Sequence, residues 1–184
     1  MQVFERAGRK NTLATLNSAL NYAKEKNITE IVLASTYGDT ALKAVDLIDT
    51  SQFKLIIITH NFGFKEPGKL EMTKEIRQEL MQKGATVYTG TMPFRNIGTA
   101  IRQGLKYSQQ DLIANTLRLM GQGLKVCVEL ALMASDAGLV GLEDIITIAG
   151  TGRGADTACV IKPASSNNLF DLKVRQIIVK PYDW

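Results

Sequence analysis

Two short stretches of the sequence carry residue types that hold phosphate groups. Residues 34–40 read ASTYGDT, and residues 150–157 read GTGRGADT. Glycines let backbone amides come close to an anion, hydroxyl side chains can donate hydrogen bonds to phosphate oxygens, and the guanidinium of Arg153 can bind those oxygens through two nitrogens. The two stretches therefore predict the two halves of a phosphate site, one that binds a ligand rather than reacting with it.

Each stretch also has a purely structural interpretation. Ser35 or Thr36 could be the N-cap of a helix, with Gly38 as a turn residue before it. The second stretch does not open a helix, so the dinucleotide-binding glycine pattern does not apply to it, and it could be a glycine-rich hairpin turn with a solvated arginine. Residue types alone leave both alternatives open.

His60, the only histidine, is expected at the end of an apolar strand and is followed by Asn61. No second histidine or group of carboxylates lies near it in the sequence, so we expect no metal centre. His60 is a candidate for hydrogen bonding to a ligand or for acid–base work, and a structural role is the alternative. A hydrolase would have only His60 and Asp39 as scattered candidates.

One motif must be rejected. Residues 63–69 have the spacing of a phosphate-binding P-loop up to its lysine, but Leu70 stands where a magnesium-binding hydroxyl is required. Pro67 also lacks a backbone N–H. We therefore expect neither an ATPase nor a GTPase.

Charged and sulfur-containing side chains in apolar segments need partners or burial. Glu129 follows Lys125 by one helical turn in an otherwise apolar segment, which predicts an intrahelical ion pair. Cys127 and Cys159 have no CxxC spacing, so we predict two buried apolar side chains with no redox or metal role.

The first half of the chain alternates between helical and strand patterns. Helices are predicted at residues 12–23, 41–48 and 72–83, and strands at residues 31–34, 55–59 and 85–89. This order implies right-handed crossovers and a parallel sheet, in which ligands bind beyond the carboxyl ends of the strands. Those ends are polar here: Ser35-Thr36, His60-Asn61 and Thr89-Gly90-Thr91.

In the second half, helical patterns at residues 97–106 and 111–137 precede strands at residues 145–149, 157–161 and 174–179. Gly121 and Gly123 predict a break or a close contact inside the longer helical pattern, and Gly138 is its expected cap. The linker 150–156 is too short for a helical crossover, so strand 157–161 should run antiparallel to its predecessor or diverge from it. We expect one domain over residues 1–184.

Composition agrees with a globular protein that binds a small anion. The 184 residues are 45% hydrophobic and 22% charged, with a net charge of +4 that is scattered along the chain. Scattered charge favours a small anionic ligand over nucleic acid. Residues 1–6 lack the apolar core of a signal peptide and no apolar stretch reaches membrane-spanning length, so we expect a cytoplasmic protein without membrane contact.

The two glycine-bearing stretches resemble the phosphate-contacting loops of the pyruvate kinase C-terminal (alpha/beta) domain. The whole chain is similar to stand-alone pyruvate kinase C-terminal-like proteins, which are mostly archaeal and of uncharacterised activity. Further matching segments are Gly8 with Asn11-Thr12, residues 123–129, Lys162-Pro163-Ala164, Asn167-Asn168 and Phe170-Asp171. The segment 89–110 departs from the resemblance, so we assign it no ligand role.

The resemblance implies a three-layer α/β/α sandwich whose sheet is mostly parallel with one antiparallel strand. The barrel that performs phosphoryl transfer in pyruvate kinase is missing, so that reaction is not expected. Stand-alone members have been found with flavin mononucleotide (FMN), which implies FMN as the ligand. The residues implied to bind the cofactor are Ser35, Thr36, Gly38, Asp39, Thr40, Thr151, Gly152, Arg153, Gly154, Ala155 and Thr157, with His60 and Asn61 near the flavin ring.

Two functions follow as expectations. The first is an FMN-binding protein, which leaves open whether it is a flavin-dependent oxidoreductase. The alternative is a non-catalytic regulatory or sensor module for a sugar phosphate or another nucleotide. The apolar region 112–133 could supply a dimer face.

Overall fold

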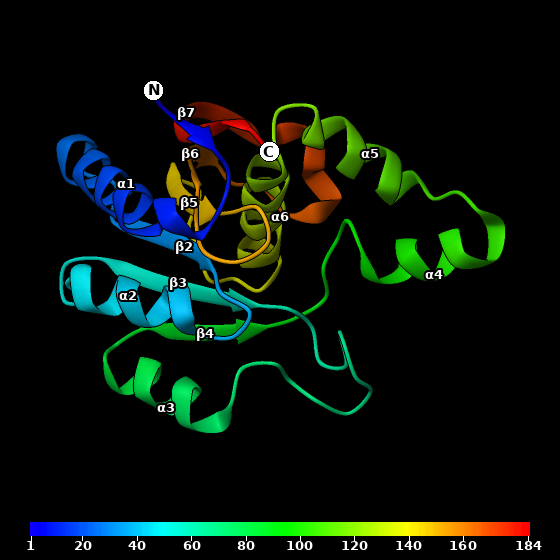
Figure 1. Ribbon diagram of the computed structural model, residues 1–184, viewed down its shortest axis with the longest axis horizontal. Coiled ribbons are helices and arrows are strands. Elements are labelled where there is room, and N and C mark those ends of the chain that lie inside the picture. Colours follow the sequence, from blue (N-terminus) through cyan, green and yellow to red (C-terminus); the bar gives the residue numbers. More distant parts are fainter.

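The computed structural model describes all 184 residues, and a seven-stranded sheet lies at its centre (Figure 1). The strand order across the sheet is β1-β7-β6-β5-β2-β3-β4. The strands are β1 (Gln2–Arg6), β2 (Glu30–Ala34), β3 (Lys54–Thr59), β4 (Thr86–Thr89), β5 (Ile145–Ala149), β6 (Thr157–Lys162) and β7 (Lys173–Asp183).

The sheet is mostly parallel, with one reversed strand, as expected. β2 pairs in parallel with β3 and β5, β3 with β4, and β1 with β7. Only β6 runs antiparallel to both of its neighbours, β5 and β7. The short linker explains the reversal, because Ala149 and Thr157 are register partners at the two ends of the turn 150–156.

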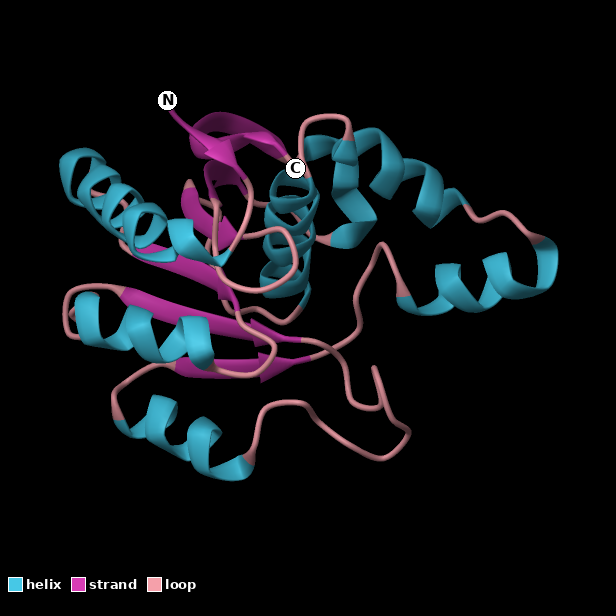
Figure 2. Ribbon diagram, in the orientation of Figure 1, coloured by secondary structure: helices cyan, strands magenta, loops and turns pink.

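Helices cover both faces of the sheet, which gives the expected three layers (Figure 2). One face carries α1 (Thr12–Lys26), α2 (Asp39–Leu47) and α3 (Lys74–Gln82), and the other carries α6 (Gln122–Asp136). In β2, Ile31 and Leu33 belong to the first core and Val32 to the second, as the alternation of side chains along a strand requires. The remaining α-helices, α4 (Asn96–Leu105) and α5 (Gln109–Arg118), extend beyond the sandwich on the side of α6, and two short 3₁₀ helices lie at Arg9–Asn11 and Ser166–Asp171.

The long helical pattern 111–137 is two helices. Gly121 has a φ of 125° and separates α5 from α6, while Gly123 packs so closely on β6 that an added Cβ would collide with Thr157. Both expectations for this region, a break and a close contact, are therefore correct, each at its own glycine. Gly138 has a φ of 64° just beyond α6, as expected of a cap.

The sequence did not predict β1. Its residues are mostly exposed, and the strand pairs only with β7, so it carries no buried face that an apolar pattern could reveal. The apolar region 112–133 is largely core, because α6 is buried almost throughout, and it leaves Leu112, Leu119 and Met120 exposed.

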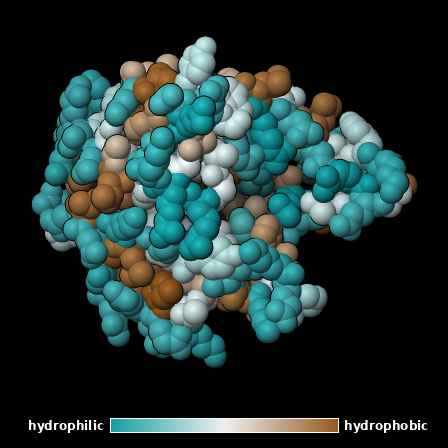
Figure 3. All heavy atoms as spheres, viewed as in Figure 1, coloured by the Kyte–Doolittle hydropathy of each residue, from teal (hydrophilic) through white to brown (hydrophobic).

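The two cysteines are buried and free, as predicted. Cys127 on α6 donates to the carbonyl of Thr147 at 3.5 Å. A hydrogen bond with Cys127, together with burial, raises the pKa of Cys159 well above its usual value. None of the helices combines the length and the apolar character needed to cross a membrane. The surface in Figure 3 is mainly hydrophilic, with hydrophobic residues in separate patches.

Candidate functional site

Two adjoining cavities lie at the carboxyl ends of β2, β3 and β5. The smaller, of about 220 Å³, lies between the loop before α2 and the glycine loop 150–154. The larger, of about 470 Å³, continues toward α4, α5 and α6. The two cavities adjoin, and we refer to them together as the cleft; they share the lining residues Ala34, Ser35, Thr36, His60, Arg95, Gln122 and Val126.

The loop before α2 leaves helix amides available to an anion. The N-cap of α2 (Asp39–Leu47) is Gly38, so neither Ser35 nor Thr36 is the N-cap that the sequence offered as an alternative. Ser35 Oγ, which precedes the N-cap by three residues, nevertheless accepts a hydrogen bond from the amide of Ala41 in the first turn at 3.2 Å. Gly38 begins the helix with a φ of 97°, and a Cβ there would collide with Ile76. The amides of Asp39 and Thr40 have no acceptor within the helix, and the helix dipole makes this end attractive to phosphate.

The glycine loop is held in shape from the protein interior. A Cβ on Gly154 would lie 2.6 Å from Thr12 Oγ1, and Gly154 also has a φ of 83°. The buried carboxylate of Asp156 accepts hydrogen bonds from the amides of Gly8 and Thr151, each at 3.0 Å, and from the hydroxyl of Thr157 at 2.8 Å. Asp156 thus joins the glycine loop to the segment that follows β1.

Arg153 reaches across the smaller cavity toward α2. Its Nη2 lies 3.3 Å from a carboxylate oxygen of Asp39, which also lies 3.7 Å from Nη2 of Arg9. The guanidinium carbon of Arg153 is 4.9 Å from the ring centroid of Tyr37. Two arginines thus share one carboxylate, and a net positive charge remains for a ligand.

The structure brings together eight of the thirteen expected site residues around the smaller cavity: Ser35, Thr36, Asp39, Thr40, His60, Gly152, Arg153 and Gly154. The other five line neither cavity. Gly38 forms the turn, and Asn61 donates from its side-chain amide to the carbonyl of Phe62.

The remaining three expected residues support the glycine loop from inside. Ala155 is buried and donates its amide to Thr12 Oγ1 at 3.1 Å. Thr157 is buried at the start of β6, and its hydroxyl donates a hydrogen bond to the carboxylate of Asp156. The hydroxyl of Thr151 is buried without a hydrogen-bond partner.

His60 lies where the two cavities meet and is neutral at physiological pH. Burial lowers its pKa from 6.5 to about 4, and its ring centroid lies 3.8 Å from that of Phe64. Its Nδ1 is 3.5 Å from the hydroxyl of Thr36. A neutral imidazole can donate or accept a hydrogen bond but adds no charge to the cleft.

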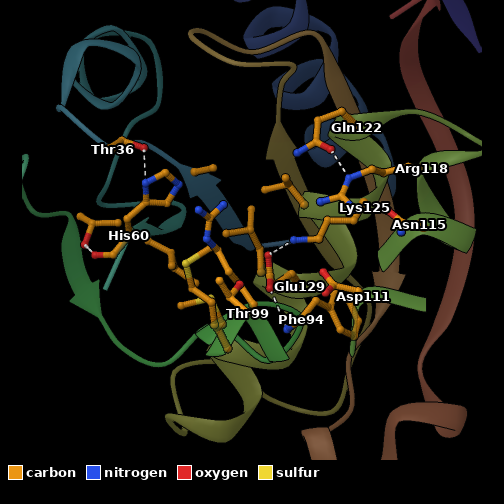
Figure 4. Close-up of a pocket in the computed structure, with 18 of the residues that line it drawn as sticks. Thr36, His60, Phe94, Thr99, Asp111, Asn115, Arg118, Gln122, Lys125 and Glu129 are labelled. Atoms are coloured by element: carbon orange, nitrogen blue, oxygen red, sulfur yellow. Dashed lines mark hydrogen bonds and ion pairs between the residues drawn. The ribbon is translucent and has the colours of Figure 1, made fainter. Parts of the chain in front are cut away.

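The predicted ion pair between Lys125 and Glu129 is confirmed, with a distance of 2.5 Å. Its position in the wall of a cavity was not predicted. Both side chains are almost fully buried, and both line the larger cavity (Figure 4). Glu129 also accepts the amide of Phe94 at 2.9 Å. Burial lowers the pKa of Lys125 below its usual range.

The rest of the larger cavity was missed by the sequence analysis. Its lining comes from the segment 89–110, to which we had assigned no ligand role, and from α5 and α6. The additional residues include Met92, Arg95, Thr99, Arg102, Asp111, Asn115, Arg118, Gln122, Leu130 and Met133. The only sequence signal was the recurrence of arginine, which does not distinguish a cavity from a solvated surface.

No protein-family model matches the chain. Among solved structures, the chain is similar to Cryptosporidium parvum pyruvate kinase in complex with ADP, with 16% sequence identity and a TM-score of 0.43. The match covers 82% of this chain and 23% of that one, so the chain spans about a quarter of the length of that enzyme. Likeness of this degree carries no information on ligand or activity.

Proposed function

We propose that this protein binds a phosphorylated small molecule at the cleft, with the phosphate between the start of α2 and the glycine loop. One observation carries the proposal: Thr36, Thr40 and Arg153, from stretches more than a hundred residues apart, line one small cavity beside free helix amides. Charge-assisted hydrogen bonds from such groups are the usual means of holding a phosphate.

FMN is the first ligand to test. The cleft offers apolar side chains for a flat ring, including Met92, Phe94 and Leu130, and its volume falls in the range of cofactor sites. Phosphate donors at one end and a mixed apolar and polar cavity at the other fit the two parts of FMN. Bound flavin would supply redox chemistry, while Arg153 and the α2 amides would hold its phosphate and neutral His60 would offer a hydrogen bond.

An absorbance spectrum of freshly purified protein, between about 350 and 500 nm, tests for bound flavin. We expect a flavin spectrum, or quenching of flavin fluorescence when FMN is added. Arg153→Gln should weaken FMN binding by about tenfold, whereas Arg175→Gln, at an exposed ion pair with Asp144, should not. Colourless protein that leaves added FMN fluorescence unchanged would eliminate FMN.

A non-catalytic sensor of a sugar phosphate or another nucleotide is the second candidate. It is favoured by the polar character of the larger cavity, since only seven of its 20 lining residues are hydrophobic. A panel of phosphorylated metabolites should then raise the melting temperature, with a stabilisation of about 2.7 kcal/mol at a hundred times the dissociation constant. If FMN and every member of the panel leave the melting temperature unchanged, the phosphate site itself is wrong.

A further inference from the structure

A buried ion pair lies in the wall of the larger cavity. Only three residues with charged side chains are buried in this protein: Lys125, Glu129 and Asp156. Asp156 accepts three hydrogen bonds inside the fold, whereas Lys125 and Glu129 line the cavity. The desolvation of a buried ion pair offsets most of its attraction, and well-packed apolar residues in its place are often equally stable. Stability alone therefore does not explain why this pair lies beside a cavity.

The amino group of Lys125 has only one acceptor within the protein. Nζ donates to Oε2 of Glu129 at 2.5 Å and lies 5.7 Å from the ring centroid of Phe94. An ammonium group has three N–H donors, so two of them have no protein partner. Figure 4 shows the side chain of Lys125 extending toward Glu129 among the residues that line the cavity. A molecule in the cavity can therefore approach the nitrogen atom.

Glu129 is held in an orientation that suits proton transfer. Its Oε1 accepts the amide of Phe94 at 2.9 Å, which leaves Oε2 to Lys125. A carboxylate that is fixed on one side and contacts an amino group on the other can take a proton from nitrogen and deliver it to a neighbouring oxygen.

Two further positive charges lie near the amino group. Arg95 and Arg118 line the same cavity, and neither has a carboxylate at ion-pairing distance. Burial lowers the pKa of Lys125, and the charges of Arg118 and Arg95 lower it further, against the opposing effect of Glu129. A desolvated lysine beside other cationic groups is the kind that acts as a nucleophile.

We propose that Lys125 is a nucleophile that forms an imine with a small aldehyde or ketone in the larger cavity, and that Glu129 moves the protons. The cavity, of about 470 Å³, is large enough for such a molecule, and Thr99 and Asn115 in its lining can bind hydroxyl groups of the compound. This inference does not depend on the phosphate site, because neither Lys125 nor Glu129 lines the smaller cavity.

The reaction balances within the ion pair. Lys125 gives a proton to Glu129, and the free amine attacks the carbonyl carbon, so that a C–N bond forms and the carbonyl oxygen takes the proton from Glu129. Glu129 then removes a second proton from nitrogen and delivers it to the hydroxyl group, which leaves as water while the nitrogen lone pair forms the C=N bond. The product is a protonated imine beside a carboxylate. The buried charges are therefore paired at the end of the reaction as at its start, and water is the only other product.

Reductive trapping in the wild-type protein tests the imine directly. The protein is incubated near neutral pH with glycolaldehyde or dihydroxyacetone, cyanoborohydride supplies a hydride that reduces any protonated imine to a secondary amine, and peptide mass spectrometry locates the label. Lys54 is the matched control, because it is also paired with a glutamate, Glu30, at 3.2 Å, but is half-exposed. We expect Lys125 to be labelled about a hundredfold faster than Lys54, the lower end of what positioned acid–base groups supply. Equal rates, or label at Lys54 alone, would refute the proposal.

Exchange of the carbonyl oxygen gives a second measurement without a reductant. In water enriched in oxygen-18, formation and hydrolysis of the imine replace the carbonyl oxygen of dihydroxyacetone with solvent oxygen. The wild type should accelerate this exchange, whereas Lys125→Arg, which keeps a positive charge beside Glu129 but cannot form an imine, should not. Exchange by Lys125→Arg at the wild-type rate would refute the role of Lys125.

The phosphate site is tested separately with Arg153→Gln, which should exchange oxygen as fast as the wild type. A protein that accelerates exchange but binds no phosphorylated ligand would contradict the phosphate site alone. A protein that binds FMN or another phosphorylated ligand without accelerating exchange would contradict the imine alone.

Discussion

The guanidinium of Arg153, which should hold the phosphate, already faces a carboxylate. Asp39 lies 3.3 Å from Arg153, at the first position of α2, where a bound phosphate would approach. Its negative charge interacts favourably with the helix dipole and so stabilises the start of α2, but it repels a bound phosphate. Binding and stability therefore make opposite demands on this residue.

Asp39→Asn should bind phosphate more tightly and be slightly less stable. Removing the carboxylate frees Arg153 and Arg9, and because the pairs are partly exposed we expect about two- to fivefold higher affinity for inorganic phosphate or FMN. The free energy of unfolding should fall by about 0.5 kcal/mol through loss of the favourable charge at the helix start. Calorimetric titration and denaturant unfolding measure the two effects. Asp46→Asn, on the same helix but paired with surface Lys83, should not change affinity, and weaker binding by Asp39→Asn would show that its carboxylate contacts the ligand.

His60 should make the protein sensitive to acid. Its pKa is about 4 in the folded state and 6.5 ordinarily, so below 6.5 the unfolded chain binds a proton that the folded chain does not. The free energy of unfolding is therefore unaffected by His60 above pH 6.5 and falls as the pH is lowered from 6.5 toward 4. We expect a total decrease of about 2 kcal/mol after allowance for the partial exposure of the imidazole. NMR titration of the imidazole gives its pKa directly, and His60→Gln should flatten this part of the stability profile. A measured pKa of 6 or above would contradict the burial argument.

At the scale of elements, helix α6 both packs on the sheet and supplies residues that line the cleft. One side of the helix is packed on β5 and β6, and from the other Gln122, Lys125, Val126 and Glu129 reach the larger cavity. Its start at Gly121 separates it from α5, which lets Arg118 and Gln122 meet across the break. The contact of Gly123 with Thr157 sets how closely the helix lies to the strand that follows the glycine loop.

Gly123→Ala should therefore destabilise the protein, although alanine is the better helix former. The added Cβ would meet Thr157 Oγ1 and Cβ, and we expect a loss of about 2 kcal/mol in the free energy of unfolding. Gly104→Ala in α4 is the matched control, because no atom lies within 4 Å of its added Cβ. There the intrinsic propensity should dominate and stabilise the protein by about 0.5–1 kcal/mol. Denaturant unfolding of both variants distinguishes packing from propensity, and equal effects would show that α6 can shift away from β6.

At the scale of the whole molecule, the features that depend on one short segment could be predicted from the sequence, whereas the features that form only when distant segments pack together could not. The alternation of apolar strands and amphipathic helices predicted the parallel half of the sheet, and the short linker 150–156 predicted the reversed β6. The two loops of the smaller cavity were visible because each is one short stretch with its own residue types. The larger cavity draws single residues from many segments, such as Thr36, Arg95 and Arg118, and only packing brings them together. Strand β1 was missed for the related reason that its partner, β7, lies at the other end of the chain.

Asp156 connects these distant parts, so its replacement should have effects far along the chain. Oδ2 of Asp156 accepts the amides of both Gly8 and Thr151, and Oδ1 accepts the hydroxyl of Thr157. In Asp156→Asn, either the side-chain NH₂ would face both of these amide donors or the hydroxyl of Thr157 would lose its acceptor. We expect a loss of about 2–3 kcal/mol in the free energy of unfolding, since the site is buried, together with weaker phosphate binding. Amide hydrogen exchange should accelerate in both β1 and the loop 150–154. Asp144→Asn, whose carboxylate meets only exposed Arg175, is the control and should change neither. If only the loop 150–154 exchanges faster, Asp156 shapes the loop but does not hold the N-terminal segment to the site.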